Sequence, residues 1–242
     1  MSRSFASTTH DSEALVLRRV EYGEADLILT LFTRSLGKVS AMARSARKSR
    51  RRFGGMLEPF FTLTVRLQER PGVEIMQLTE AALRTPRLGL LADLTRLEAA
   101  GRALGWVRAA APPRTPEPEV WATIERLLDR LARSDNQRSP ELELAEAGLS
   151  LLNGFGWGID FERCVRCGKP CPEHQPAGVD PLQGGLVCRA CGGARLRVAS
   201  DQRVRLARAA AGDGNALDPS DGRLALDIVE RSLEHHAGIG AG

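Results

Sequence analysis

Two pairs of cysteines form the most specific chemical pattern in the chain. Each pair has two residues between its members, a glycine follows each pair, and twenty residues separate the pairs; the four cysteines are Cys164, Cys167, Cys188 and Cys191. Two thiolates at this spacing can reach one ion, and the glycine permits the left-handed turn that such a knuckle needs. The sequence therefore predicts one structural Zn²⁺ held by four thiolates.

Other interpretations of the cysteines are weaker. Disulfides are disfavoured because the first twenty residues lack the apolar core of a signal peptide, and five cysteines are an odd number. A catalytic zinc needs an open coordination position and a general base, and the deaminase pattern H-x-E before P-C-x-x-C is absent. His174 is the alternative fourth ligand, and Cys171 is expected to be a bystander near the site.

A run of basic residues forms the second candidate site. Between Leu27 and Leu57 there are eight Lys or Arg residues and no Asp or Glu. The whole chain carries +4, so the residues outside this window sum to −4. Concentrated positive charge is the electrostatic footprint of a nucleic-acid site. The predicted phosphate-binding residues are Lys38, Arg44, Arg47, Lys48, Arg50, Arg51 and Arg52.

Two further groups bear on this site. The aromatic residues nearest to the basic run are Tyr22, Phe53, Phe60 and Phe61, but aromatics make up only 5% of the chain, so phosphate contacts are expected to dominate over base stacking. A second basic group either extends the path of a nucleic acid or forms a solvated helix face. Its members are Arg195, Arg197, Arg203, Arg205 and Arg208.

Strands must position the basic run, because the N-terminal part alternates apolar and polar residues. After a polar lead-in over residues 1–12, strands are expected over 13–20, 25–33, 39–43, 61–68 and 73–78. Tyr22-Gly23-Glu24 suits a tight hairpin. Five short strands indicate a small closed barrel of the OB-fold type, with an unrelated small barrel or sandwich as the alternative.

Helices are expected past Pro86, where the apolar period changes to 3.6. They are predicted over 90–107, 120–131, 140–152, 201–211 and 223–237, and Ser139-Pro140 suits the start of the third. The predicted fold class is α+β, an OB-fold barrel followed by a helical domain with an inserted four-cysteine zinc element. The predicted boundaries are 1–84 for the barrel, 85–160 for the first helical part, 161–198 for the zinc insert and 199–242 for the last helices.

No motif of the sequence indicates catalysis. Gly37-Lys38 lacks the first glycine and the Ser or Thr of a P-loop, and Gly154-Phe155-Gly156-Trp157-Gly158 lacks the third glycine of a dinucleotide fingerprint. A binding protein is therefore expected rather than an enzyme. No run approaches the ~18 apolar residues of a membrane span, so a cytoplasmic location without a membrane is predicted.

The order of the motifs resembles the RecO family of bacterial recombination mediators. Gly37-Lys38 is followed by Ala43-Arg44-Ser45-Ala46-Arg47 and by Leu57-Glu58-Pro59-Phe60. Phe161-Glu162-Arg163-Cys164 then leads into the first cysteine pair, and Gly184-Gly185-Leu186-Val187-Cys188 leads into the second. The resemblance covers nearly the whole chain.

The resemblance implies a non-catalytic protein of recombinational DNA repair. Such a protein binds single- and double-stranded DNA and anneals complementary strands. With RecR it helps to load RecA onto DNA covered by single-stranded-DNA-binding protein, and it associates with the nucleoid when bound to DNA. The residues alone support only an OB-fold nucleic-acid binder with structural zinc. An OB-fold, zinc-containing RNA-binding protein of translation or RNA processing is therefore the alternative, and a zinc-dependent hydrolase acting on nucleic acid ranks third.

Overall fold

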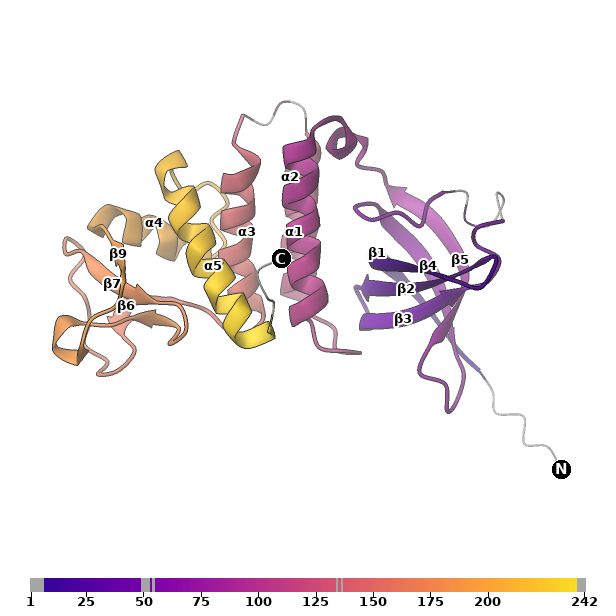
Figure 1. Ribbon diagram of the computed structural model, residues 1–242, viewed down its shortest axis with the longest axis horizontal. Helices are drawn as coiled ribbons and strands as arrows, with labels where there is room; N and C mark the ends of the chain where they lie inside the picture. Colours follow the sequence, from indigo (N-terminus) through magenta and orange to yellow (C-terminus); the bar gives the residue numbers. More distant parts are fainter. Residues whose placement is uncertain (1–6, 49–52, 54, 134, 136, 239–242) are drawn as a thin grey trace. The chain divides into compact units, whose positions relative to one another are not determined.

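The computed structural model describes residues 7–48, 53, 55–133, 135 and 137–238 (Figure 1). The chain divides into two compact units, residues 1–88 with 111–121, and residues 89–110 with 122–242. We call them the barrel unit and the helical unit. The division into four parts that the sequence predicts, with boundaries after residues 84, 160 and 198, stays a prediction.

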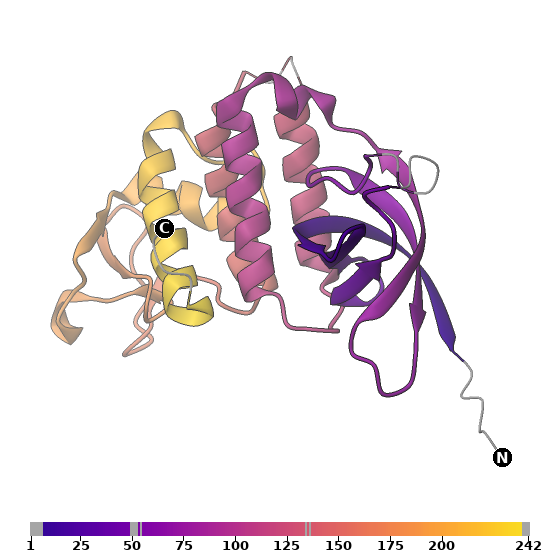
Figure 2. The same cartoon turned by 45° about the vertical axis from the view of Figure 1, so that its right-hand side comes forward.

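The barrel unit contains five strands that close on themselves in the order β1-β2-β3-β5-β4. Figure 1 labels these strands, and Figure 2 shows them in the same indigo to magenta colours after a turn of 45°. They are β1 (Thr8–Tyr22), β2 (Asp26–Thr33), β3 (Gly37–Ala43), β4 (Thr62–Glu69) and β5 (Met76–Thr85). Only β3 and β5 pair in parallel, over Ala41–Met76 and Met42–Gln77. The predicted OB-fold barrel is confirmed.

Alternation along the strands fills the barrel, because every second side chain points inward. Leu27, Leu29 and Leu31 of β2 are buried in one core cluster with Leu63 and Val65 of β4. The sequence pattern of these strands therefore already contains the barrel core.

The first and last strands differ from the prediction. β1 begins at Thr8, because Thr8–Asp11 pairs with Glu69–Arg66 of β4, so the polar lead-in up to residue 12 was wrong over this segment. β5 runs from Met76 to Thr85 rather than over 73–78, since it follows β4 as far as the Thr62–Thr85 pair. Val73 and Ile75 are exposed in the preceding loop.

A segment from the middle of the chain, residues 111–121, completes the barrel unit. Arg114 donates its backbone N–H to the Lys38 carbonyl oxygen at 2.9 Å and its guanidinium to Glu69 at 2.6 Å. The ring of Trp121 packs against that of Phe32, with centroids 5.7 Å apart. The barrel is therefore covered by residues that lie beyond the first helix in the chain.

Gly37 permits this close approach, and Gly37→Ala is expected to lower the free energy of unfolding by about 2–5 kcal/mol. Its φ is +69°, and an added Cβ would lie 1.9 Å from the Thr115 carbonyl oxygen. Gly72 is the matched control, with a φ of +76° and open space around its Cβ position. Gly72→Ala is expected to cost only about 1–2 kcal/mol of conformational strain. Urea denaturation measures both, and equal losses would contradict the role of the Thr115 contact.

The helical unit is built around one buried helix, α3, which packs against α1, α4 and α5 (Figure 1). The helices are η1 (Leu88–Ala92), α1 (Leu94–Ala110), α2 (Pro118–Ala132), α3 (Pro140–Gly154), α4 (Ser200–Ala210), η3 (Pro219–Asp221) and α5 (Gly222–Ala237). The Ser139 hydroxyl accepts the Leu142 N–H at 3.2 Å, which confirms the predicted start of α3. Leu91 and Leu94 lie within the helix expected over 90–107, but both are exposed.

A buried network of charges joins α2, α3 and the loop before α5. Glu143 is 1% exposed. The Arg130 guanidinium contacts both of its carboxylate oxygens, at 2.6 and 2.8 Å. Arg138 binds Glu146 at 2.6 Å, and Glu146 also accepts the Leu217 N–H at 3.0 Å. Burial raises the pKa of Glu146 above its usual value. Two carboxylates of α3 therefore hold the surrounding loops in place.

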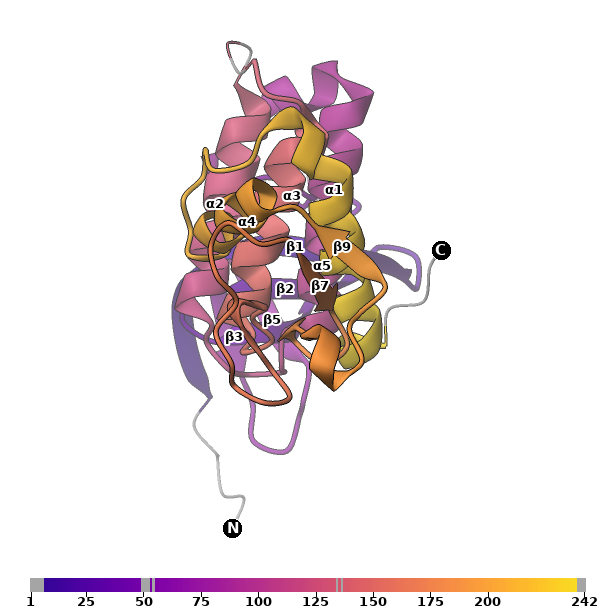
Figure 3. The ribbon, with the colours of Figure 1, turned by 90° about the vertical axis from the view of Figure 1, so that its left-hand side faces the viewer.

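The cysteine-rich segment folds as a small four-stranded sheet with the order β6-β8-β7-β9. Figure 3 labels β7 and β9 of this sheet. We call this segment the metal module. Its elements are β6 (Asp160–Cys164), β7 (Ala177–Asp180), β8 (Gly185–Leu186), the 3-10 helix η2 (Arg189–Cys191) and β9 (Leu196–Val198). This sheet was not predicted, because strands of two to five residues are too short to show a period.

Candidate metal centre and nucleic-acid interface

The four cysteines predicted as ligands meet at one point of the metal module. Their sulfur atoms all lie within 4.8 Å of one another, and the Cys167 and Cys188 sulfurs are 3.8 Å apart. A tetrahedral site with Zn–S bonds of about 2.3 Å places its sulfurs about 3.8 Å apart, whereas a disulfide measures about 2.05 Å. All five cysteines are free thiols. The cluster could hold a metal ion, and its geometry fits tetrahedral coordination.

Backbone turns aim these thiols inward. After the first pair, Gly168 has a φ of +72° and donates its N–H to the Cys164 carbonyl oxygen at 2.8 Å. After the second, Gly192 has a φ of +101°. The Cys188 N–H points at the Cys164 sulfur, 3.4 Å away. The two glycines therefore have the left-handed conformation expected of paired knuckles.

The same contacts set the acidity of the metal-free thiols. The Cys188 N–H, by donating to the sulfur, lowers the pKa of Cys164 to about 6. Hydrogen bonds with the Cys188 and Cys167 side chains raise the pKa of Cys191 to about 12. Four thiols this close cannot all ionise alone, and a bound metal cation would allow all four to become thiolates.

The other two candidate ligands lie outside this group. Among the described residues the four-sulfur cluster includes neither His174 nor Cys171. The Cys171 sulfur instead faces the Pro172 carbonyl oxygen at 3.8 Å. Arg166 braces the cluster by donating to the Cys191 carbonyl oxygen at 2.6 Å and to the Gln183 side chain at 2.7 Å.

Three of the predicted phosphate-binding residues lie together in the barrel unit, after the end of β3. Arg44, Arg47 and Lys48 are all exposed. Lys38 is half-buried and lies at the other end of β3. At ~3.3 Å per residue along a strand, it is about 20 Å from Arg44, so the structure does not bring it to the group. The remaining three, Arg50, Arg51 and Arg52, lie outside the described residues.

The turn that carries these cations is held against the β1–β2 hairpin. Asp26 accepts the Ser45 N–H at 2.7 Å, and Ser45 has a φ of +55°. Arg47 pairs with Glu21 at 3.2 Å, and Lys48 with Glu24 at 3.7 Å. These pairs are exposed, and such pairs contribute only about 0–1 kcal/mol, so a phosphate can replace the carboxylates. We call Arg44, Arg47 and Lys48 the basic turn.

A sheet surface continues the basic turn, and the sequence prediction missed part of it. On the side of β1–β2–β3 away from the core, Arg18 lies beside Thr30. Val20 follows beside Ile28, and Tyr22 lies at the hairpin. A bulge between Val16 and Arg18 shifts the alternation here. Arg18 was not predicted because it lies outside the window from Leu27 to Leu57 that defined the basic run. OB-folds bind nucleic acids through the face of strands 2 and 3 and through the loops between strands 1 and 2 and between strands 4 and 5. Of the residues named here, Tyr22 at the β1–β2 hairpin and Ile28 and Thr30 of β2 belong to that region.

Burial separates the candidates for base stacking. Tyr22 is 54% exposed, whereas Phe53 is 1% exposed in the barrel core, and Phe61 packs against that core. Tyr22 is therefore the aromatic residue best exposed for a base near the basic turn.

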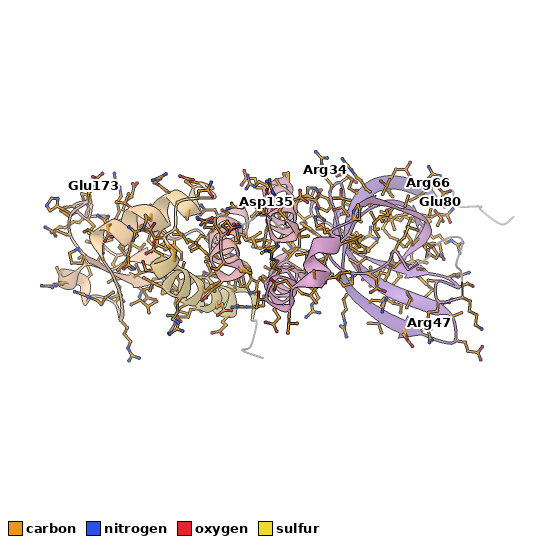
Figure 4. The ribbon with its side chains drawn as sticks, turned by 90° about the horizontal axis from the view of Figure 1, so that it is seen from above. Arg34, Arg47, Arg66, Glu80, Asp135 and Glu173 are labelled. Atoms are coloured by element: carbon orange, nitrogen blue, oxygen red, sulfur yellow. The ribbon has the colours of Figure 1, made fainter. Side chains whose placement is uncertain are left out.

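Figure 4 shows Arg47 on another side of the barrel from Arg66 and Glu80, which pair at 2.8 Å.

The members of the second basic group, which includes Arg203, Arg205 and Arg208, differ in their contacts. Arg203 is 3% exposed and donates to the Phe161 and Pro172 carbonyl oxygens at 2.8 and 2.7 Å, which ties α4 to the metal module. Arg205 pairs with Asp221 at 2.6 Å, and Arg208 pairs with an aspartate of the following loop. Arg203 and Arg205 therefore hold the fold together, whereas Arg208 is exposed on the surface of α4.

Within the described parts of the chain, no helix is both long and apolar enough to cross a membrane. The fold and the two sites define an OB-fold protein joined to a helical unit that carries a metal-binding module.

Comparison with known proteins identifies the family. The family model described as "Recombination protein O N terminal" matches residues 7–87, and "Recombination protein O C terminal" matches residues 91–241. The DNA repair protein RecO of Anaeromyxobacter sp. (strain Fw109-5) is 37% identical over 236 residues, which cover 93% of this chain and 90% of that protein. The RecO of Geobacter sulfurreducens is 35% identical over 206 residues, 84% of this chain and 80% of that protein. The chain belongs to the RecO family of DNA repair proteins.

Proposed function

We propose that the protein binds single- and double-stranded DNA and anneals complementary strands during recombinational repair, without catalysing a reaction. The observation that carries this proposal is the basic turn beside an OB-fold sheet face with an exposed Tyr22. Cations supply affinity for phosphates without sequence preference, and an exposed aromatic ring can stack on any base. Membership of a DNA repair family supports DNA as the nucleic acid.

Annealing follows from the same charges. Two complementary strands repel each other through their phosphates, and bound cations reduce this repulsion while leaving base edges accessible. The proposal extends to partners through family membership: RecR, single-stranded-DNA-binding protein and, indirectly, RecA.

We propose Zn²⁺ as the ion of the metal module. Four thiolates with tetrahedral geometry favour it, and a site with four protein ligands has no open position for a substrate. The ion would supply charge neutralisation and a cross-link between the two cysteine pairs, and the site would serve structure.

Neutralising the basic turn should weaken binding to all DNA sequences alike. For Arg44→Gln/Arg47→Gln/Lys48→Gln, the slope of log affinity against log salt should fall by up to about 2, at about 0.7 per lost single-strand phosphate contact. Fluorescence anisotropy with labelled oligonucleotides at several salt concentrations measures it.

A matched control removes the same charge elsewhere on the barrel. Arg34, Arg66 and Arg84 each pair with a carboxylate away from the basic turn. Changing these three to Gln should leave the slope nearly unchanged, and equal effects of both variants would refute the site.

Annealing of DNA and RNA oligonucleotides decides between the candidate substrates. A strong preference for RNA without DNA annealing would overturn the proposal in favour of an RNA-binding protein.

A further inference from the structure

A cavity of about 460 Å³ lies in the metal module, beside the cysteine cluster. Its size is within the range of ligand pockets, about 300–1,000 Å³. Apolar walls come from Pro170, Pro172, Pro176, Leu186 and Val187. Neither Asp nor Glu is among the described residues that line it.

Three cations from separate segments converge on this cavity. Lys169 follows the first cysteine pair, Arg189 begins η2, and Arg197 lies in β9. Across the described chain, none of the three side chains has a hydrogen bond or ion pair. Arg166, in contrast, is committed to the cysteine cluster through the Cys191 carbonyl oxygen. The cavity therefore contains positive charge that the fold itself does not use.

The charge of a bound metal does not cancel these cations. A divalent ion with four thiolates has a net charge of −2, whereas Arg166 and the three cavity cations together carry +4. Cations beside proline and aliphatic walls match the two parts of a nucleotide, because the phosphate needs charge and the base and sugar need apolar surface.

A peptide ligand fits the cavity less well. Ala177 and Gly178 of β7 line it, but β7 pairs with β8 on one side and β9 on the other. β7 therefore has no free edge onto which a peptide could add its backbone. The edge strand β9 contributes the cation Arg197 to the lining, so a peptide in this cavity would have to be acidic. We propose that this cavity is a second nucleic-acid contact of the protein, which takes a phosphate-bearing stretch of single-stranded DNA at the metal module. The inference rests on the proposed function.

The test is a charge-neutralised variant, Lys169→Gln/Arg189→Gln/Arg197→Gln, in the full-length protein. Its salt slope for single-stranded DNA should fall by up to about 2. Cross-linking of an oligonucleotide that carries 5-iodouracil should label peptides within residues 169–197, and the variant should lose this label. Excess inorganic phosphate should compete only weakly, and an acidic peptide that displaces the DNA from these residues would overturn the choice of ligand.

The control variant is Arg133→Gln/Arg208→Gln/Arg231→Gln, which removes the same charge from ion-paired residues of the helical unit. It should leave the cross-link and the slope nearly unchanged. If elemental analysis shows that the triple variant has lost its metal, the single variant Arg197→Gln replaces it in the test. The salt slope of this single variant should fall by about 0.7. A metal-replete variant with an unchanged slope and cross-link would overturn this inference. The basic-turn variant, measured in the same assay, shows separately whether the proposed function stands.

Discussion

Replacing Cys164 with Ser should release the metal and unfold residues 160–198 while the barrel unit stays folded. Structural zinc contributes roughly 10–16 kcal/mol of apparent binding free energy in small zinc domains, far more than strands of two to five residues can supply. The barrel core contains no residue of the metal module, so it should not follow. Elemental analysis and hydrogen exchange measured by peptide mass spectrometry check both parts.

Cys171→Ser is the matched control, because Cys171 lies near the site but outside the four-sulfur group in the described chain. It should keep one zinc per chain and the exchange pattern of the wild type. Because Cys164 is itself buried, a chelator applied to the wild-type protein gives an independent result. Slow exchange in residues 160–198 without any metal would contradict the structural role of the site.

Removing Glu143 should destabilise the helical unit more than any exposed charge does. In Glu143→Ala, Arg130 and Arg138 would lose the carboxylate that both contact, at 2.6 and 3.4 Å. Loss of one partner of a buried pair costs about 3–5 kcal/mol, because the remaining charge stays desolvated. Thermal and urea denaturation of the full-length protein measure the loss.

Glu141→Ala is the control on the same helix. Glu141 is exposed in the first turn of α3, where a carboxylate contributes about 0.3–1 kcal/mol through the helix dipole. A loss for Glu143→Ala no larger than that for Glu141→Ala would mean that water reaches the buried arginines and that the network contributes little.

The features predicted from sequence are those with a local signal. Alternation in residues 25–33 and 61–68 predicts strands, and the C-x-x-C-G spacing predicts a shared metal site, because each pattern lies within a few residues. Glu143 and Glu146 are different, because no local pattern marks these two carboxylates of the helix as buried. They are buried because arginines from α2 and from the loop before α3 reach them.

The same limit explains the arginines of α4. Their sequence shows only a basic helix, and whether Arg203 and Arg205 bind a ligand or the fold depends on carbonyl oxygens and carboxylates far along the chain. Likewise, no pattern in residues 111–121 indicates that the chain returns there to cover the barrel.

Residues 111–121 also determine which part of the gene encodes a complete barrel unit. Secondary structure changes from strands to helices at residue 85, yet Phe32 is covered by Trp121, and the Lys38 backbone is bonded to Arg114. A recombination event that transferred residues 1–88 alone would transfer a barrel with a bare aromatic face and an unpaired carbonyl group. A fragment that also includes the first helix and residues 111–121 is therefore expected to be more stable than residues 1–88 alone.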